Sequence, residues 1–350
     1  MPKSILVLRG CSPEPLASYL KALGVLRLVV EQKDHGATGW WEGEHFHLQS
    51  SLTRDDLIAF FLQEYRPTPI IAPWNGASGF WDKTTAHKAL EAIARSSNPR
   101  LMEYRTTIER AKEIIAHLAI RSKPNKVQKP LLLRACRAHL PDAAVKWLDA
   151  AYQLTGETTK YPPLLGTGGN DGKLDFTSNF MQNIQHAVPL VEVSDSDRDV
   201  KQFDLSRKRL DKALFGEEDV PLAEAAIGQF NPGGVGGPNA VQGFEGSSLV
   251  NPWDFIFMIE GALLSTGSTS WRLSGDRRRQ TAFPFTVRTC AAGWGSLTEV
   301  TDDAARSEVW LPIWDKPAGL AELSLLFGEG RAQIGPHQAQ TGVDFARALA

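Results

Sequence analysis

The sequence predicts a mixed α+β fold that is mainly helical, with short strands and long glycine-rich ordered loops. Three observations lead to this prediction. Apolar residues recur at helical spacing over many segments, whereas alternating segments are few and short. Helices and strands do not alternate regularly, as they would in a doubly wound sheet. Glycine and proline supply 30 and 21 of the 350 residues, and their clusters between periodic segments indicate ordered loops on a globular scaffold.

The first elements follow from apolar patterning. Residues 4–11 read as a buried strand, and residues 16–30 carry leucine and valine at helical spacing after Pro15, which suits a first helical turn. Residues 39–50 alternate like a half-exposed strand. Thr53 with Asp56 resembles a capping box that opens another helix. Further helices are expected near 84–96, 99–120, 130–139, 142–155 and 177–187, with a charged, exposed helix within 194–215.

The last third combines a glycine-rich loop with a well-marked helix. Asn251 suits an N-cap and Pro252 a first helical position, so a helix is expected over 251–264. Short strands are expected within 270–313, one helix after Pro317 and another at the end of the chain. We therefore expect three segments, which are an N-terminal α/β domain (1–125), a mainly helical region (126–220) and a region of glycine-rich loop, helix and short strands (221–350).

Charge and cysteine content limit the functional classes. The formal net charge is −2, so no global basic field indicates a free-standing DNA-binding protein, although local basic patches remain compatible with nucleic acid. The three cysteines, Cys11, Cys136 and Cys290, form no C-x-x-C pair and predict buried free thiols in a reducing cytosol. The chain shows neither a signal-peptide pattern nor an apolar run of membrane-spanning length. We expect a cytoplasmic protein that does not engage a membrane.

Searches for catalytic motifs give negative results. Neither glycine loop matches a phosphate-binding P-loop or G-x-G-x-x-G, and Gly76–Phe80 does not match G-x-S-x-G. His45 and His47 are better explained as solvent-facing than as metal ligands, since no further ligands complete a site. We therefore expect no catalytic residues, no metal and no cofactor. One alternative stays open: Asp171 and Asp175, in a tryptophan-rich chain, as the carboxylate pair of a carbohydrate-active hydrolase.

The remaining polar features favour a nucleic-acid surface. Asparagine amides can contact base edges, exposed backbone N–H groups can contact phosphates, and clustered lysine and arginine supply positive charge. The same amides are also common turn formers, and basic clusters are often only solvated faces. The candidate nucleic-acid-binding residues are Asn231, Gly233, Gly234, Gly236, Gly237 and Asn239; Gly168, Gly169, Asn170 and Lys173; Asn75; Lys123, Lys126 and Lys129; and Arg277, Arg278 and Arg279.

Five long motifs carry a resemblance to a known family. They are LVLRGCSPEPLASYLKALGVLRLVVEQ, APWNGASGFW, PPLLGTGGNDGKLDFTSNFMQ, NPGGVGGPNAVQGFEGSSLVNPWDFIFMIEGALL and VWLPIWDKPAGLAELSLLFGEGRAQIG. In this order, across nearly the whole chain, they resemble the large subunit of type I-G (formerly I-U) CRISPR-Cas interference complexes. Members of that family are typically longer, so the chain is similar to their N-terminal part.

The resemblance implies a function without catalysis. Large subunits of this class lie at the end of the Cascade complex that holds the 5′ handle of the guide. They engage the protospacer-adjacent motif (PAM) in duplex DNA, aid unwinding and R-loop formation, and help to recruit a helicase–nuclease in antiviral defence. The implied partners are CRISPR RNA, double-stranded target DNA, the backbone and handle-binding subunits of the same ribonucleoprotein complex, and the helicase–nuclease. The resemblance does not indicate which residues read the motif.

Overall fold

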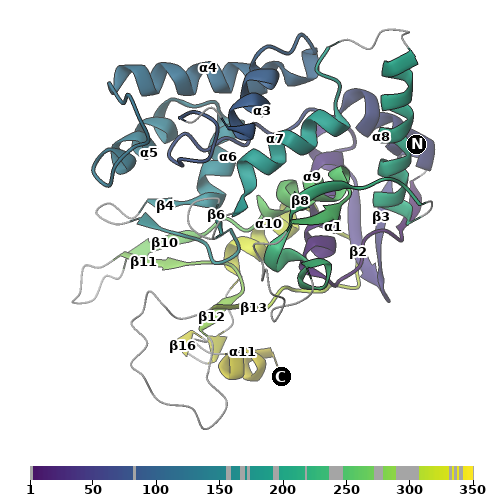
Figure 1. The fold of residues 1–350 in the computed structure, drawn as a ribbon. Coiled ribbons are helices and arrows are strands. Elements are labelled where there is room, and N and C mark those ends of the chain that lie inside the picture. The colour runs from purple at the N-terminus through teal and green to yellow at the C-terminus, as the bar shows by residue number, and fades with distance from the viewer. Residues whose placement is uncertain are drawn as a thin grey trace.

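The structure is a computed structural model, and it describes most of the chain as a mixed α+β fold (Figure 1). The fold class predicted from the sequence is confirmed. One sheet has four antiparallel strands in the order β1-β3-β2-β14, and the other sheets are two-stranded. The described residues are 3–81, 84–154, 159–165, 170–171, 174–191, 197–216, 219–235, 247–271, 279–288, 307–330, 333–334, 337–338 and 342–349.

The four-stranded sheet joins three strands from the start of the chain with one from its last part. Its strands are β1 (Ser4–Leu8), β2 (Thr38–Glu42), β3 (His45–Ser50) and β14 (Ala318–Gly319). The alternating stretch over 39–50, which we expected as one strand, folds into a hairpin. Gly43 lies at its turn with φ of +59°, a left-handed conformation that glycine adopts without strain. The first strand also ends earlier than expected, at Leu8 rather than Cys11.

Two buried helices form the centre of the core. Helix α1 (Leu16–Gln32) and helix α9 (Pro252–Ala262) pack along each other, with apolar residues on nearly all their faces. A Cβ at Gly24 would stand 2.0 Å from the carbonyl oxygen of Phe257, and one at Gly261 would stand 1.9 Å from that of Leu20. The helices can therefore approach this closely only because glycine occupies both crossing positions.

A buried charged network lies within the same junction. Arg27 of α1 donates to the Glu260 carboxylate of α9 at 2.6 Å, and Glu260 has no exposed surface. Glu260 also accepts from the Tyr65 hydroxyl at 2.7 Å and from the Thr68 backbone N–H at 3.0 Å. Burial alone would lower the pKa of Arg27, but the facing carboxylates of Glu260 and Glu31 outweigh it and raise the pKa. Arg27 is thus held in its charged form.

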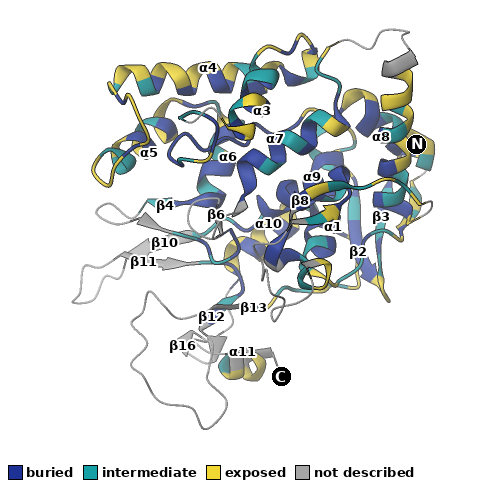
Figure 2. Ribbon diagram, in the orientation of Figure 1, coloured by how far each residue is buried: buried dark blue, intermediate teal, exposed yellow. Residues whose placement is uncertain are grey.

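The other helices surround this centre, and Figure 2 shows their buried faces directed inward. They are α2 (Arg54–Ala59), continued as a π-helix over Phe60–Glu64; α3 (Thr85–Ala94); α4 (Met102–His117), preceded by a 3₁₀ turn over Pro99–Leu101; α5 (Gln128–His139); α6 (Asp142–Ala151); α7 (Phe176–Ala187); α8 (Asp197–Phe215); α10 (Leu320–Glu329); and α11 (Gly342–Leu349).

Short antiparallel pairs complete the fold. They are β4 (Gln153–Leu154) with β5 (Thr159–Lys160), β6 (Asn170–Asp171) with β7 (Leu174–Asp175), β8 (Ala223–Ala226) with β9 (Ser247–Val250), β10 (Ser268–Trp271) with β11 (Arg279–Ala282), β12 (Thr286–Arg288) with β13 (Ser307–Val309), and β15 (Gln333–Ile334) with β16 (His337–Gln338). Two 3₁₀ turns, η3 (Gly228–Phe230) and η4 (Pro232–Val235), open the longer glycine loop.

Two of the predicted helix starts are confirmed in detail. The Thr53 hydroxyl accepts from the Asp56 N–H while the Asp56 carboxylate accepts from the Thr53 N–H, which makes a reciprocal capping box. The Asn251 side chain accepts from the Trp253 N–H at 3.1 Å, with Pro252 at the first helical position. The boundaries of the three expected segments stay predictions, since α9 of the last segment packs on α1 of the first.

The structure also bears on the predictions for the cysteines and for membrane-spanning segments. Cys11 and Cys136 are buried free thiols, and burial raises the pKa of each to about 12, which keeps them protonated. Cys290 lies outside the described residues. Within the described ranges, no helix combines the length and the hydropathy needed to cross a lipid bilayer.

Candidate nucleic-acid interface

The connector between α4 and α5 carries three of the predicted lysines. Lys123 and Lys126 are exposed on it, and Lys129 is half-buried in the first turn of α5. Asn125 fixes the turn between them, because its Oδ1 accepts from the backbone N–H groups of Val127 and Gln128 at 2.9 Å each. The connector is the exposed loop that joins the left ends of α4 and α5 in Figure 2.

Two tyrosines flank the most buried of these lysines. The Lys129 Nζ lies 5.4 Å from the centroid of the Tyr152 ring and 5.8 Å from that of the Tyr161 ring, within the range of a cation–π interaction. The two rings meet edge to face, with centroids 5.0 Å apart. Burial lowers the pKa of Lys129, and the neighbouring charge of Lys123 lowers it further. We call Lys123, Lys126, Lys129, Tyr152 and Tyr161 the lysine–tyrosine surface.

Gly76, in the loop that precedes α3, lies beneath one lysine of this surface. A Cβ at Gly76 would stand 2.7 Å from Cδ and Cε of Lys123 and 2.9 Å from its Nζ, so the lysine side chain lies directly over the glycine. Asn75, which we expected to contact nucleic acid, is only 5% exposed. Its N–H donates to the Ala72 carbonyl and its carbonyl accepts from the Ser78 hydroxyl. In this structure Asn75 shapes the loop, and Gly76 receives the lysine.

The lysine–tyrosine surface carries positive charge that no carboxylate of the described residues pairs with. Among the described residues, no carboxylate lies within ion-pair distance of Lys123, Lys126 or Lys129. Two lysines on the helices that contact α5 differ. Lys112 of α4 contacts Glu91 at 2.7 Å, and Lys146 of α6 contacts Glu31 at 2.9 Å. Of these lysines, only those on the connector leave their charge available to an external anion.

The longer glycine loop is described only at its start. Asn231 is half-buried, and its Oδ1 accepts from the Gly234 N–H at 3.2 Å, so the side chain closes the η4 turn. Gly233 and Gly234 are exposed beside it. Gly236, Gly237 and Asn239 lie outside the described residues. The turn-forming role of Asn231 is therefore visible, whereas its contact with a base edge stays a prediction.

The other predicted residues are described only in part. Asn170 and Asp171 form β6, which pairs with β7, and their side chains lie outside the description. Arg279 begins β11 opposite Trp271, again without a described side chain. The remaining candidates lie outside the described residues altogether: Gly168, Gly169, Lys173, Arg277 and Arg278.

The carboxylate of Asp175 has a structural role. Asp175 is 6% exposed and caps α7, with Oδ1 accepting from the Ser178 N–H at 2.9 Å and from the Thr177 hydroxyl at 2.5 Å. Its Oδ2 is buried and has no hydrogen-bond partner among the described residues. Burial raises the pKa of Asp175, although these hydrogen bonds act in the opposite direction. Such a carboxylate serves the helix end rather than a substrate.

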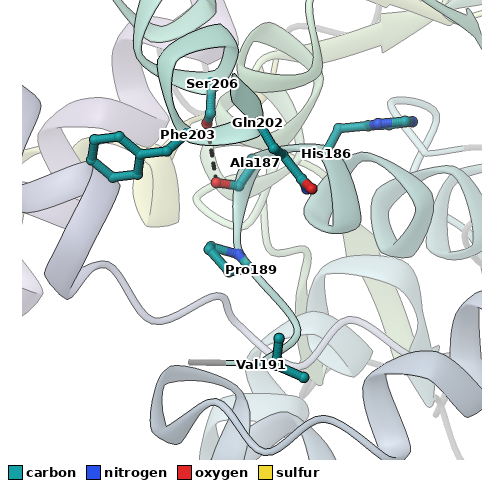
Figure 3. A pocket seen from close by; sticks show the side chains of 7 residues that line it. All are labelled: His186, Ala187, Pro189, Val191, Gln202, Phe203 and Ser206. Atoms are coloured by element: carbon teal, nitrogen blue, oxygen red, sulfur yellow. Dashed lines mark hydrogen bonds between the residues drawn. The ribbon is translucent and has the colours of Figure 1, made fainter. Parts of the chain in front are cut away.

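Two other features lie apart from the lysine–tyrosine surface. His45 and His47 share one face of β3, and His47 stacks on Trp40 with centroids 5.4 Å apart. In the described part of the chain, no three potential ligands are grouped to hold a metal. A hollow of about 30 Å³ lies between the end of α7 and α8, where Ser206 donates to the Ala187 carbonyl at 3.1 Å (Figure 3).

The sequence did not indicate that the tyrosines belong with the lysines. Tyr152 follows α6 and Tyr161 follows β5, and neither stands near a lysine cluster in the chain. Tyr152 also packs edge to face on Trp74, with centroids 5.5 Å apart, which links this surface to the Asn75 loop. No sequence signal connects these positions, because the packing of α4, α5 and α6 brings them together.

Comparison with models of known protein families and with curated protein sequences finds no match to this chain.

Proposed function

We propose that this chain is a non-catalytic large subunit of a CRISPR RNA-guided DNA surveillance complex in the cytoplasm. In this role it engages the PAM duplex, aids R-loop formation and helps to recruit a helicase–nuclease. The five-motif resemblance suggests the complex. The observation that carries a nucleic-acid role is the lysine–tyrosine surface, where three lysines lack described carboxylate partners.

This surface suits a subunit of an RNA-guided machine. In such complexes base pairing reads the target sequence, and the protein contributes backbone contacts and recognition of a short duplex motif. Lysine contacts to phosphate position a nucleic acid but carry no sequence information. A near-neutral chain with a local basic surface is consistent with this division of work. We propose that Arg277, Arg278 and Arg279 add phosphate contacts, and that Asn231 or Asn239 contacts a base edge.

The hydrolase alternative gains no support from Asp175. A general acid or nucleophile must reach its substrate, but this carboxylate is buried and one of its oxygens caps α7. The inert, buried thiols of Cys11 and Cys136 offer no nucleophile either. These observations favour binding over catalysis as the function of the chain.

Co-expression with the other subunits tests the proposal. We expect the chain to enter a particle that contains guide RNA and binds target DNA. Replacing Lys123, Lys126 and Lys129 together by alanine should weaken target binding for all sequences alike. If each lysine contacts a phosphate, the slope of log affinity against log salt should fall by about 0.9 per contact for duplex DNA or about 0.7 for a single strand, so by roughly 2–3 in total.

The matched control is the pair of lysines that have acidic partners. Replacing Lys112 and Lys146 by alanine also removes positive charge but should leave the salt slope unchanged, since these ammonium groups already contact Glu91 and Glu31. An RNA-free chain that enters no particle, or one that cleaves a glycan, would contradict the proposed function.

A further inference from the structure

Lys129 is held differently from the other connector lysines. Its ammonium is half-buried between the Tyr152 and Tyr161 rings, while Lys123 and Lys126 project into solvent. Tyr152 is 1% exposed, so it forms the floor of the surface, and Tyr161 is half-buried at its edge. The ammonium of Lys129 and the partly exposed Tyr161 ring thus lie side by side, 5.8 Å from the nitrogen to the ring centroid.

The positive charges of Lys123 and Lys129 favour the binding of an anion. Lys123 lies over Gly76 in the loop whose Trp74 packs on Tyr152, and Lys129 lies over the same Tyr152 ring, so the two lysines border one patch of surface. The charge of Lys123 also lowers the pKa of Lys129, and no described carboxylate lies within ion-pair distance of either lysine. Two neighbouring ammonium groups repel unless an opposite charge compensates. A phosphate diester carries that charge, and it offers oxygen acceptors for both ammonium groups.

Tyr161 indicates whether this surface suits a duplex or an unpaired strand. In a duplex each base is stacked between its neighbours, so an aromatic side chain cannot lie on its face. In an unpaired strand the base faces are free, and stacking on aromatic rings beside a positively charged path is how proteins bind single strands. A lysine pair next to a half-exposed tyrosine therefore fits an unpaired strand better than a duplex.

We propose that Lys123, Lys129 and Tyr161 bind one nucleotide unit of an unpaired strand, with its phosphate between the two ammonium groups and its base against Tyr161. This inference rests on the proposed function and narrows the ligand of the lysine–tyrosine surface to single-stranded nucleic acid. Gly76 is the positioning residue of the site, because the Lys123 side chain occupies the space that a Cβ at residue 76 would fill.

Fluorescence anisotropy with labelled oligonucleotides about 16 nucleotides long tests the proposal. Single-stranded RNA, single-stranded DNA and a DNA duplex of the same sequence are titrated with the purified chain and with the assembled particle. A preference for RNA would assign the strand to the guide, and binding of DNA would assign it to the opened target. Either result supports the binding of a single strand by Lys123, Lys129 and Tyr161.

The variants separate stacking from charge. Tyr161→Leu keeps an apolar side chain of similar reach but removes the aromatic face, so single-strand binding should weaken by about 10-fold while duplex binding stays unchanged. Replacing Lys123 and Lys129 by alanine should lower the single-strand salt slope by about 0.7 for each contact, so by about 1.4 in total. Lys112→Ala, whose lysine is paired with Glu91, is the control and should have no effect.

Gly76→Ala tests the position of Lys123 without removing its charge. The new methyl group must displace the flexible end of the lysine, so binding should weaken less than in Lys123→Ala. In a chain that already carries Lys123→Ala, Gly76→Ala should cause no further loss. Thermal unfolding of each variant checks that the fold is retained, and the lysine variants still test the proposal if Tyr161→Leu fails to fold.

Two results would overturn the inference. One is an equal effect of Tyr161→Leu on single strands and duplex, or no effect on either. The other is additive loss from Gly76→Ala and Lys123→Ala. If the particle assembles and binds its target while these results are found, only the inference fails. If neither the chain nor any particle binds nucleic acid, the proposed function fails with it.

Discussion

Replacing Gly24 by alanine should strongly destabilise the protein. Gly24 lies where α1 crosses α9, and the new methyl carbon would stand 2.0 Å from the Phe257 carbonyl oxygen, 2.9 Å from its carbonyl carbon and 3.0 Å from the Gly261 nitrogen. All three obstacles are backbone atoms of α9. They cannot rotate away as a side chain would, so one helix must move as a body.

The structure gives the size of that movement. Ordinary van der Waals contact begins at 3.4 Å, so the helices must separate by roughly 1.4 Å at the crossing. A radial gap of about 0.5–1 Å already forfeits a quarter to a half of the attraction between facing atoms. Overpacked cores usually lose about 1–3 kcal/mol and occasionally more. Because this junction also holds the buried Arg27–Glu260 pair, we expect a loss of about 4 kcal/mol.

Urea unfolding followed by far-UV circular dichroism measures this effect. Gly328→Ala is the matched control, because that glycine lies in the exposed part of α10 with open space around it. The same substitution there should stabilise the protein by about 0.5–1 kcal/mol through helix propensity. A second check is Gly24→Ala with Gly261→Ala. Since one separation of the helices accommodates both methyl groups, the combined loss should be smaller than the sum. A loss below about 1 kcal/mol for Gly24→Ala would refute the reasoning.

Two further predictions concern buried charge. Glu260→Gln should lower the free energy of unfolding by about 3–5 kcal/mol, because it leaves Arg27 charged and buried without its nearest partner. Replacing Arg27 by methionine in that variant should recover part of the loss. Additive losses from the two substitutions would contradict the pairing. Asp175→Asn should change the pH dependence of unfolding. The folded state raises the pKa of Asp175 above its ordinary 3.8, so it binds the proton more tightly than the unfolded chain, and its contribution is largest below pH 3.8 and is lost as pH rises through the folded pKa. The variant should therefore gain stability relative to the parent as pH rises from 3.8, and parallel pH curves would contradict this prediction.

The features that the sequence predicted well are local. The capping box at Thr53 and Asp56 and the Asn251–Pro252 helix start depend on residues within three or four positions of one another. Their hydrogen bonds can form as soon as the local chain is helical, so pattern and structure agree. The hairpin over 39–50 was missed because alternation alone does not show where a strand turns, and Gly43 is the residue that supplies the turn.

The pattern of apolar and polar residues could not predict contacts between segments far apart in the sequence. The helical pattern over 16–30 gave Gly24 no role, and only its contact with α9 explains it. The candidate site likewise combines residues that the sequence predicted with residues that it did not. The connector lysines were predicted from their charge, but Tyr152 and Tyr161 join them through tertiary packing. Asn75 was expected at the surface because amides on glycine loops often are, yet its loop turns the residue inward.

The α1–α9 junction also bears on the resemblance that supports the proposed function. Two of the five motifs contain these helices, and packing explains their less usual residues, since Gly24 and Gly261 permit the crossing while Arg27 and Glu260 neutralise each other inside it. Those residues would be needed in this fold whatever the protein binds. The connector lysines belong to none of the quoted motifs. The resemblance and the lysine–tyrosine surface are therefore separate grounds for a nucleic-acid role. It follows that lysine variants should alter binding without altering the stability of the core.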